Sequence, residues 1–194
     1  MTRAPHEIPA TGPAAEFAAQ LRAALPVLDT DRLILRAPRI EDFETYAAIG
    51  ESERGRYLVE DNSERDALWL DFTQMVAGWL LRGHGVWTVE TRDTGDTIGF
   101  VLLGFEPGDH EPELGYLFLP EAEGHGYAQE ATRAARAHAF DTLGMKTLVS
   151  TIDHDNTRSI RLAERLGATR DAAAEAAHDN TIQVYRHCAE ETLQ

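Results

Sequence analysis

Apolar residues near the start of the chain recur every four positions, as they do on one face of a helix. Phe17, Leu21 and Leu25 show this spacing within the segment AAEFAAQLRAAL, so we expect a short helix there. The preceding segment, MTRAPHEIPATGP, is rich in Pro and Ala and predicts a loose tail. We therefore assign residues 1–27 to a tail with a short added helix, and residues 28–194 to one domain.

Strand-like and helix-like patterns follow each other through the rest of the chain. The run RLILRAP places Leu33 and Leu35 on one side of a strand, which Pro38 ends. Ser63 can act as the N-cap of a later helix, in which Asp66 completes an imperfect capping box. The expected elements are strands at 32–38, 113–119, 147–152 and 181–187, helices at 41–49, 63–82, 128–143 and 156–166, and two strands on either side of residues 93–96.

This order of elements predicts the fold class. The DTGD sequence at residues 93–96 lies between two apolar runs and indicates an antiparallel hairpin. After this antiparallel start, strands and helices alternate, and a polar, Ala-rich loop precedes the last strand. We therefore predict an α/β (α+β) fold whose mixed central sheet is antiparallel in its N-terminal part and carries helices on both faces.

Composition and charge exclude several classes of protein. A net charge of −15 argues against nucleic-acid binding, because affinity for phosphate backbones comes mainly from Lys and Arg. The acidity favours a cationic partner, although solubility alone is a sufficient reason for it. Cys188 is the only cysteine, which suits a reducing compartment, so we expect a cytoplasmic protein. We expect neither export nor membrane insertion, because no apolar run is long enough for either.

The stretch EGHGYAQE at residues 123–130 carries the first chemical signal. Gly124 and Gly126 lie between a strand and a helix, where backbone N–H groups of the first helical turn and the helix dipole attract an anion. A tight turn without a ligand is the alternative that this short motif leaves open. The dinucleotide motif does not fit, because Gln129 stands where it needs a third glycine, and the lysine of a P-loop is missing. A different phosphate ligand is required.

Three segments in order resemble the GNAT superfamily of acetyl-CoA-dependent N-acetyltransferases, and within it the bacterial ribosomal-protein N-terminal acetyltransferases. They are TDRLILRAPRIEDF, ELGYLFLPEAEGHGYAQEA and DNTRSIRLAERLGA. The resemblance covers residues 30–187 and implies a GNAT fold with acetyl-CoA as co-substrate. It implies that the pyrophosphate is bound by the loop and first helical turn, and pantetheine by the strand backbone. The pyrophosphate residues are Gly124, His125, Gly126, Tyr127, Ala128 and Gln129. The pantetheine residues are Leu117, Phe118 and Leu119.

Glu123 departs from the pattern of this family, which has Gln or Arg at the corresponding position. A carboxylate there repels a pyrophosphate unless it turns to solvent. The helix after the coenzyme loop departs as well, because Ala163 stands where many GNAT enzymes have a general-acid Tyr.

The resemblance also implies residues for the chemistry. Transfer of acetyl to an amine needs a base for the ammonium and a proton for the departing thiolate. The resemblance assigns the base to Glu113, and Glu111 is a competing carboxylate. It assigns Ser159 to the coenzyme sulfur, with a capping or exposed hydroxyl as the alternative. Asn156 corresponds to a coenzyme-contacting Asn, but Asn156 or Asp155 can equally be an N-cap.

Other reactive or aromatic residues receive structural interpretations. The eight histidines show no paired helical spacing and no Cys partner, so we expect no metal site. Trp69, Trp79 and Trp87 lie in or beside apolar segments and are predicted core or pocket-wall residues. The resemblance places Tyr57 and Trp79 in the region that shapes the acceptor pocket.

The sequence therefore predicts an enzyme that binds acetyl-CoA along residues 113–119 and transfers acetyl directly to a primary amine. The acceptor is a protein N-terminus or a small cationic amine. The alternative is an acyl-CoA-binding sensor or interaction module with little turnover, which Glu123 and the missing Tyr motivate. We expect no nucleic-acid or membrane partner. The last predicted strand, at 181–187, can support a homodimer.

Overall fold

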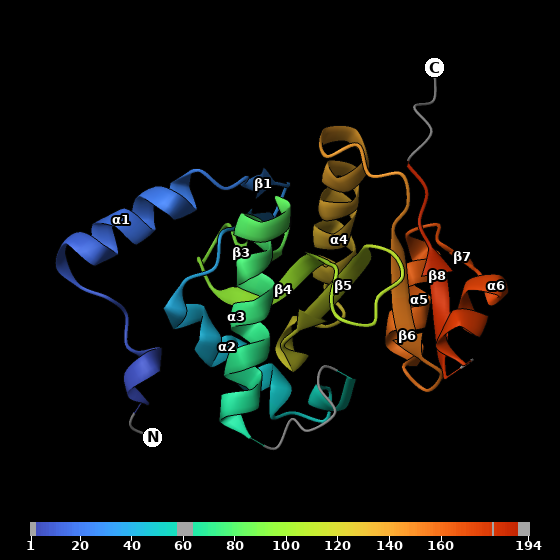
Figure 1. Ribbon diagram of the computed structural model, residues 1–194, viewed down its shortest axis with the longest axis horizontal. Coiled ribbons are helices and arrows are strands. Elements are labelled where there is room, and N and C mark those ends of the chain that lie inside the picture. Colours follow the sequence, from blue (N-terminus) through green and yellow to red (C-terminus); the bar gives the residue numbers. More distant parts are fainter. Residues whose placement is uncertain (1–2, 58–63, 180, 190–194) are drawn as a thin grey trace.

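A computed structural model of the protein describes residues 3–57, 64–179 and 181–189. Its strands form one eight-stranded sheet in the order β1-β2-β3-β4-β5-β6-β8-β7, and only β5 and β6 are parallel neighbours (Figure 1). The strands are β1 (Leu28–Asp29), β2 (Leu33–Arg36), β3 (Val86–Thr91), β4 (Thr97–Gly104), β5 (Glu113–Phe118), β6 (Val149–Asp153), β7 (Thr169–Arg170) and β8 (Ile182–Arg186). The predicted mixed sheet with an antiparallel start is confirmed.

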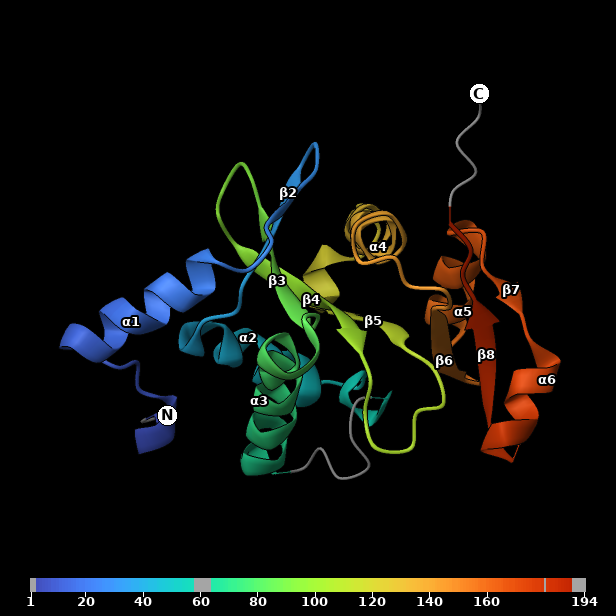
Figure 2. The same cartoon turned by 45° about the horizontal axis from the view of Figure 1, so that its top comes forward.

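Helices cover both faces of this sheet, as the sequence predicts (Figure 2). The main helices are α1 (Gly12–Ala23), α2 (Phe43–Gly50), α3 (Arg65–Arg82), α4 (Tyr127–Ala137), α5 (Thr157–Arg165) and α6 (Ala172–Glu175). Short 3-10 turns lie at Pro5–Glu7, Ile40–Asp42, Gly55–Tyr57, Pro120–Ala122 and Ala176–His178, and a π-helical turn at His138–Thr142 follows α4. No helix among the described residues has the length and apolar character that a membrane span needs.

Alternation along the central strands divides the core between the two faces. Trp87 and Val101 are fully buried and pack in one apolar cluster with alanines of α4. Their strand neighbours Val86 and Phe100 pack in a second cluster, with residues of α2 and α3. Each large apolar side chain removed from water contributes about 1.5–3 kcal/mol, so this two-sided burial fixes the strand register.

The sheet splits between β5 and β6, and this split positions the site. The two strands share one paired position, Glu113 with Val149, and then diverge. On its other side β5 keeps β4 as a full antiparallel partner, from Glu113 to Phe118. Beyond the shared pair, one edge of β5 therefore lacks a neighbouring strand. Figure 2 shows β6 and β8 standing apart from the group formed by β3, β4 and β5.

The N-terminal segment differs from the predicted loose tail. The Glu7 side chain is only 3% exposed and accepts hydrogen bonds from Arg65 Nε (2.7 Å) and Nη2 (3.0 Å) at the start of α3. The His6 ring lies 4.9 Å from the ring of Trp69. The added helix is confirmed as α1, but it buries no residue, and Phe17 on its predicted apolar face is 61% exposed. The tail is thus attached to α3, while α1 projects from one side of the molecule (Figure 1).

Two predicted elements differ from the structure, and one predicted cap cannot be compared with it. The Ala-rich segment before the last strand contains α6 instead of a loop only, because the Asp171 carboxylate accepts from the N–H groups of Ala173 (3.1 Å) and Ala174 (3.0 Å). The helix predicted to reach residue 143 ends its regular part at Ala137. The predicted N-cap at Ser63 lies outside the described residues, and the N-cap of α3 is Glu64.

Candidate active site

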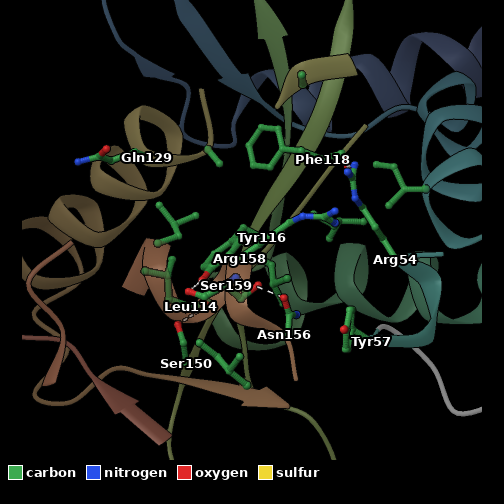
Figure 3. A pocket seen from close by; sticks show the side chains of 18 of the residues that line it. Arg54, Tyr57, Leu114, Tyr116, Phe118, Gln129, Ser150, Asn156, Arg158 and Ser159 are labelled. Atoms are coloured by element: carbon green, nitrogen blue, oxygen red, sulfur yellow. Dashed lines mark hydrogen bonds between the residues drawn. The ribbon is translucent and has the colours of Figure 1, made fainter. Parts of the chain in front are cut away.

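A cleft of about 790 Å³ opens where β5 and β6 diverge. It is lined by β5, by the loop after it with the start of α4, by the start of α5, and by residues from the segment 46–75 (Figure 3). Polar and charged side chains from all these elements therefore face one space.

The loop between β5 and α4 has the geometry that the glycine motif predicts. Gly124 and Gly126 both have φ of +78°, a left-handed conformation that glycine adopts without the steric cost of a Cβ. Gly126 is the N-cap of α4, and no described side chain caps the N–H groups of that first turn. Because Gly126, Tyr127, Ala128 and Gln129 line the cleft, these backbone donors are available to an anion.

Arg32 braces the loop from the side of β2. Its Nη1 donates to the carbonyl of His125 (2.9 Å), and its Nε donates to Glu130 Oε2 (2.7 Å) in the first turn of α4. Thr30 Oγ1 also donates to Glu130, at 2.6 Å. Burial alone raises the pKa of Glu130, but the hydrogen bonds from Thr30 and Arg32 outweigh it and lower this pKa. Glu130 therefore stays ionised and fixes the loop.

The register of β5 decides which of its backbone groups face the split. Leu119 donates its N–H to the carbonyl of Ile98 in β4 at 3.0 Å. Successive residues of a strand point their N–H and C=O groups to opposite sides, so Leu117 faces β4 while Tyr116 and Phe118 face the open edge. The carbonyl of Phe118 accepts from Arg54 Nη1 at 3.3 Å, in agreement with this assignment. The open edge can accept an extended ligand as an added strand.

Glu113 lies at the point where β5 and β6 part. Its Oε1 accepts from the N–H (3.1 Å) and the hydroxyl (2.6 Å) of Thr151 in β6. Burial raises the pKa of Glu113, and the two bonds from Thr151 only partly oppose this effect. A carboxylate whose charge is disfavoured by burial is a better proton acceptor than one held in an ion pair.

Glu111 has the opposite environment. Arg186 donates to both of its oxygens at 2.7 Å, and Thr147 donates to Oε2. The hydrogen bonds from Arg186 are the main reason that the pKa of Glu111 falls to about 2. Glu111 does not line the cleft. Of the two candidate bases, only Glu113 combines access to the cleft with a raised pKa.

The cleft is acidic beyond Glu113. Asp71 of α3 and Glu106 after β4 line this end, and Tyr46 donates its hydroxyl to Asp71. Burial, followed by repulsion from Asp71, Asp109 and Glu113, raises the pKa of Glu106 to about 7. Burial also raises the pKa of Asp71. A group of carboxyls with raised pKa values is a site that a cationic group stabilises.

The start of α5 brings two predicted residues into the cleft. Asn156 is the N-cap of α5, and its Oδ1 accepts from the N–H of Ser159 at 3.3 Å. The carbonyl of Ser159 accepts from the Tyr116 hydroxyl at 3.0 Å, which ties α5 to β5 (Figure 3). The capping interpretation of Asn156 is thus confirmed, and it leaves the Ser159 side chain at the wall of the cleft.

Glu123, the departure from the family pattern, is paired with two arginines. Its Oε1 lies 2.6 Å from Arg54 Nη2 and 3.6 Å from Arg158 Nε. Arg54 precedes the 3-10 turn at Gly55–Tyr57, and Arg158 lies in α5, so three separate segments meet beside the loop. The carboxylate does not stand beside the anion site as an uncompensated charge.

The structure brings most of the predicted site residues to the cleft, but not all. Leu119 and His125 do not line it, and the carbonyl of His125 is turned to Arg32. Tyr57 lines the cleft, whereas Trp79 is a core residue whose indole N–H donates to the carbonyl of Val86 at 2.8 Å. Among the polar lining residues that the sequence analysis missed are Tyr46, Arg54, Asp71, Glu106, Tyr116, Ser150, Thr151, Asp153, Arg158, Arg161 and Arg165.

Comparison with known proteins identifies the family that this sequence matches. The family model for the acetyltransferase (GNAT) domain matches residues 32–169. The uncharacterized N-acetyltransferase YoaA of Bacillus subtilis (strain 168) is 30% identical over 149 residues, which are 75% of this chain and 84% of YoaA.

Solved structures show the same fold. An acetyltransferase from Agrobacterium tumefaciens str. C58 has a TM-score of 0.79 and 36% identity, over 85% of this chain and 95% of that chain. RimL, a ribosomal L7/L12 alpha-N-protein acetyltransferase solved in complex with coenzyme A, has a TM-score of 0.67 over 85% of this chain and 99% of its own. At 14% identity, the likeness to RimL concerns the fold alone.

Proposed function

The chain belongs to the GNAT family of acetyltransferases, and we propose that it transfers acetyl directly from acetyl-CoA to the primary amine of a protein N-terminus or of a small cationic molecule. The observation that carries this proposal is the opposite character of the two ends of the cleft. One end has uncapped helical N–H groups with Arg54 and Arg158. The other end has Asp71, Glu106 and Glu113.

The residues present fit acetyl-CoA as the acyl donor. Gly126, Tyr127, Ala128 and Gln129 supply backbone donors for a pyrophosphate, in the nest that the left-handed glycines create. The open edge of β5 supplies backbone groups for pantetheine amides. By register this role belongs to Phe118 and Tyr116, while Leu117 and Leu119 direct their backbone groups to the β4 side.

The proposed chemistry uses Glu113 and Ser159. Acetyl-CoA supplies an activated thioester. Glu113 accepts a proton from the acceptor ammonium, directly or through water, so that the amine becomes nucleophilic. The hydroxyl of Ser159, at the wall of the cleft, is placed to donate a hydrogen bond to the sulfur as negative charge develops there. RimL acts on a protein α-amine, and this is one of the two acceptor classes proposed for this chain.

Calorimetric titration with acetyl-CoA tests the coenzyme site. We compare the intact protein with a Gly126→Trp variant, in which the indole fills the loop. The matched control is Gly144→Trp. Gly144 also has a left-handed backbone, with φ of +64°, but it is exposed and lies outside the cleft. Binding should be lost in Gly126→Trp and retained in Gly144→Trp. Equal loss in both variants would contradict the assigned site.

A second experiment separates an enzyme from a sensor. The double variant Glu113→Gln/Ser159→Ala keeps the loop and both arginines, so it should bind acetyl-CoA like the intact protein. Acetyl transfer is followed in parallel with an N-terminal peptide and with a polyamine as acceptors. Turnover by the intact protein that the double variant lacks supports an enzyme with these residues. Binding without turnover to either acceptor class supports the sensor alternative.

A further inference from the structure

Glu123 raises a question that the proposed function leaves open, namely why an anion-binding loop carries a carboxylate at its edge. The Glu123 side chain is 43% exposed, so turning to solvent is available to it. Instead it lies within ion-pair distance of Arg54 and Arg158. Two positive charges thus share one negative charge, and the group as a whole remains cationic.

Both arginines line the cleft, although the Arg158 side chain is 68% exposed. Arg54 is only 20% exposed, and its Nη1 also donates to the carbonyl of Phe118, the last residue of β5. Arg158 projects from the first turn of α5 into the same region (Figure 3). The guanidiniums come from segments about 100 residues apart in sequence, so the shared carboxylate is what joins them.

The net charge of the chain makes this placement informative. The protein has 33 acidic and 18 basic residues. Five of the acidic residues line the cleft together with four arginines, namely Arg54, Arg158, Arg161 and Arg165. Arginine is suited to phosphate because its planar fork donates two parallel hydrogen bonds. Beside the loop, Arg54 and Arg158 outnumber Glu123, and this net positive charge next to uncapped helical N–H groups indicates an anionic ligand.

We propose that Glu123 holds Arg54 and Arg158 beside the pyrophosphate loop, so that these two guanidiniums bind the phosphates of the coenzyme. In this arrangement Glu123 is a positioning residue, and the arginines are the ligands. The inference rests on the proposed function, since it takes coenzyme A as the occupant of the cleft.

The direction in which Glu123→Gln changes the affinity for coenzyme A separates the positioning role from simple repulsion. If the Glu123 carboxylate only repels phosphate, Glu123→Gln binds coenzyme A more tightly than the intact protein. If Glu123 positions the arginines, the same substitution removes the carboxylate that joins them and weakens binding, by about threefold to tenfold. Arg54→Met and Arg158→Met remove one charge-assisted contact each and should weaken binding by about tenfold.

Arg56→Met is the matched control. Arg56 lies two residues from Arg54 and carries the same charge, but it does not line the cleft, and its guanidinium pairs with Asp155 instead of Glu123. Its removal measures the effect of one lost positive charge without loss of the contact to Glu123. Arg54→Lys keeps the charge without the planar fork and should bind with intermediate affinity.

A donor without phosphates supplies the second readout. We measure acetyl transfer from S-acetylpantetheine, which contains the thioester and the pantetheine arm alone. Its KM should be the same in the intact protein, Glu123→Gln and Arg158→Met, two variants that leave the Arg54 contact with Phe118 in place, while the KM for acetyl-CoA rises in both variants. A structural disturbance of β5 would raise both KM values together.

The outcomes are distinct. Tighter binding by Glu123→Gln, arginine variants that match Arg56→Met, or an equal rise in both KM values would each overturn the inference. No binding of coenzyme A by the intact protein would instead refute the proposed function. The positioning role is supported if Glu123→Gln, Arg54→Met and Arg158→Met all bind coenzyme A more weakly than the intact protein, while the KM for S-acetylpantetheine stays unchanged.

Discussion

Replacing Glu113 by Gln tests the proton acceptor with little change in shape. The amide oxygen of Gln can still accept from the Thr151 N–H and hydroxyl, which lie 3.1 Å and 2.6 Å from Oε1 in the intact protein. The ability to take a proton is lost. General-base catalysis contributes about 10²–10⁴-fold, so kcat should fall by about that factor while the Kd for acetyl-CoA stays unchanged.

The effect of this substitution on stability follows from the direction of the pKa shift. Burial raises the pKa of Glu113, so the folded protein binds this proton more tightly than the unfolded chain does. Its contribution to stability therefore decreases as the pH rises from the ordinary carboxyl value of 4.5 through the folded-state pKa. At pH 8 the charge is a cost, and Glu113→Gln should unfold at the same temperature as the intact protein or a higher one.

Glu111→Gln, two residues away, is the matched control. We expect it to lose stability and keep its turnover, the opposite of Glu113→Gln. Its pKa is lowered to about 2 by Arg186, so its stabilisation is present above the ordinary value of 4.5 and is lost as the pH falls toward 2. Solvent screens this partly exposed pair, so at pH 7 its loss should cost about 1–2 kcal/mol. For a chain of this size that lowers Tm by about 2–8 °C. We expect kcat to stay within about threefold of the intact protein, because Glu111 is outside the cleft.

The assay is acetyl-CoA turnover from pH 5 to 9, with thermal unfolding of the same samples. For the intact protein kcat/KM should rise with pH through a carboxyl pKa above 4.5, and Glu113→Gln should lack this acidic limb. If Glu113→Gln keeps its turnover, or Glu111→Gln loses turnover without losing stability, the assignment of the base is refuted.

Two further predictions concern the scaffold. Asp42→Ala should lower the free energy of unfolding by about 3–5 kcal/mol, because it removes the 2.7 Å and 2.8 Å contacts of buried Arg36 and the hydrogen bond from Thr88. Burial opposes ionisation of Asp42, but Arg36 outweighs this effect and lowers the pKa of Asp42. The difference in Tm between Asp42→Ala and the intact protein should therefore narrow as the pH falls below 3.8, and a constant difference would contradict this. Glu7→Gln should release the N-terminal segment from Arg65 and speed hydrogen exchange in residues 3–8, without changing exchange in β3 and β4. Unchanged exchange in residues 3–8 would show that the His6 contact with Trp69 is sufficient to hold the segment.

Features set by local patterns were predictable from the sequence. Alternation in RLILRAP gives β2 its buried positions Leu33 and Leu35. The glycine motif predicts a left-handed loop before a helix, and Gly124 and Gly126 have the expected φ of +78°. These features depend on neighbours within a few residues, which a single sequence contains.

Features that depend on distant segments were not predictable in the same way. Arg54 and Glu123 meet because the loop after β5 folds back on the segment before Tyr57, and no local pattern marks that contact. The docking of Glu7 on Arg65 is of the same kind. The position of Tyr116 is an intermediate case. Once the register with β4 is known, strand alternation counted from Leu119 shows that the backbone groups of Tyr116 face the open edge of β5.

The charge of the whole chain therefore carries less information than the distribution of that charge within the cleft. A net charge of −15 suggests a cationic partner, but acetyl-CoA is an anion. The cleft reconciles the two requirements by separation along β5. Arg54 lies at the Phe118 end, where it donates to the strand, and Arg158 is joined to it through Glu123. Carboxyls with raised pKa values lie at the Glu113 end. Under the proposed function, a donor bound at one end and a cationic acceptor at the other are each stabilised by the charge beside them, and their reacting groups meet near Glu113.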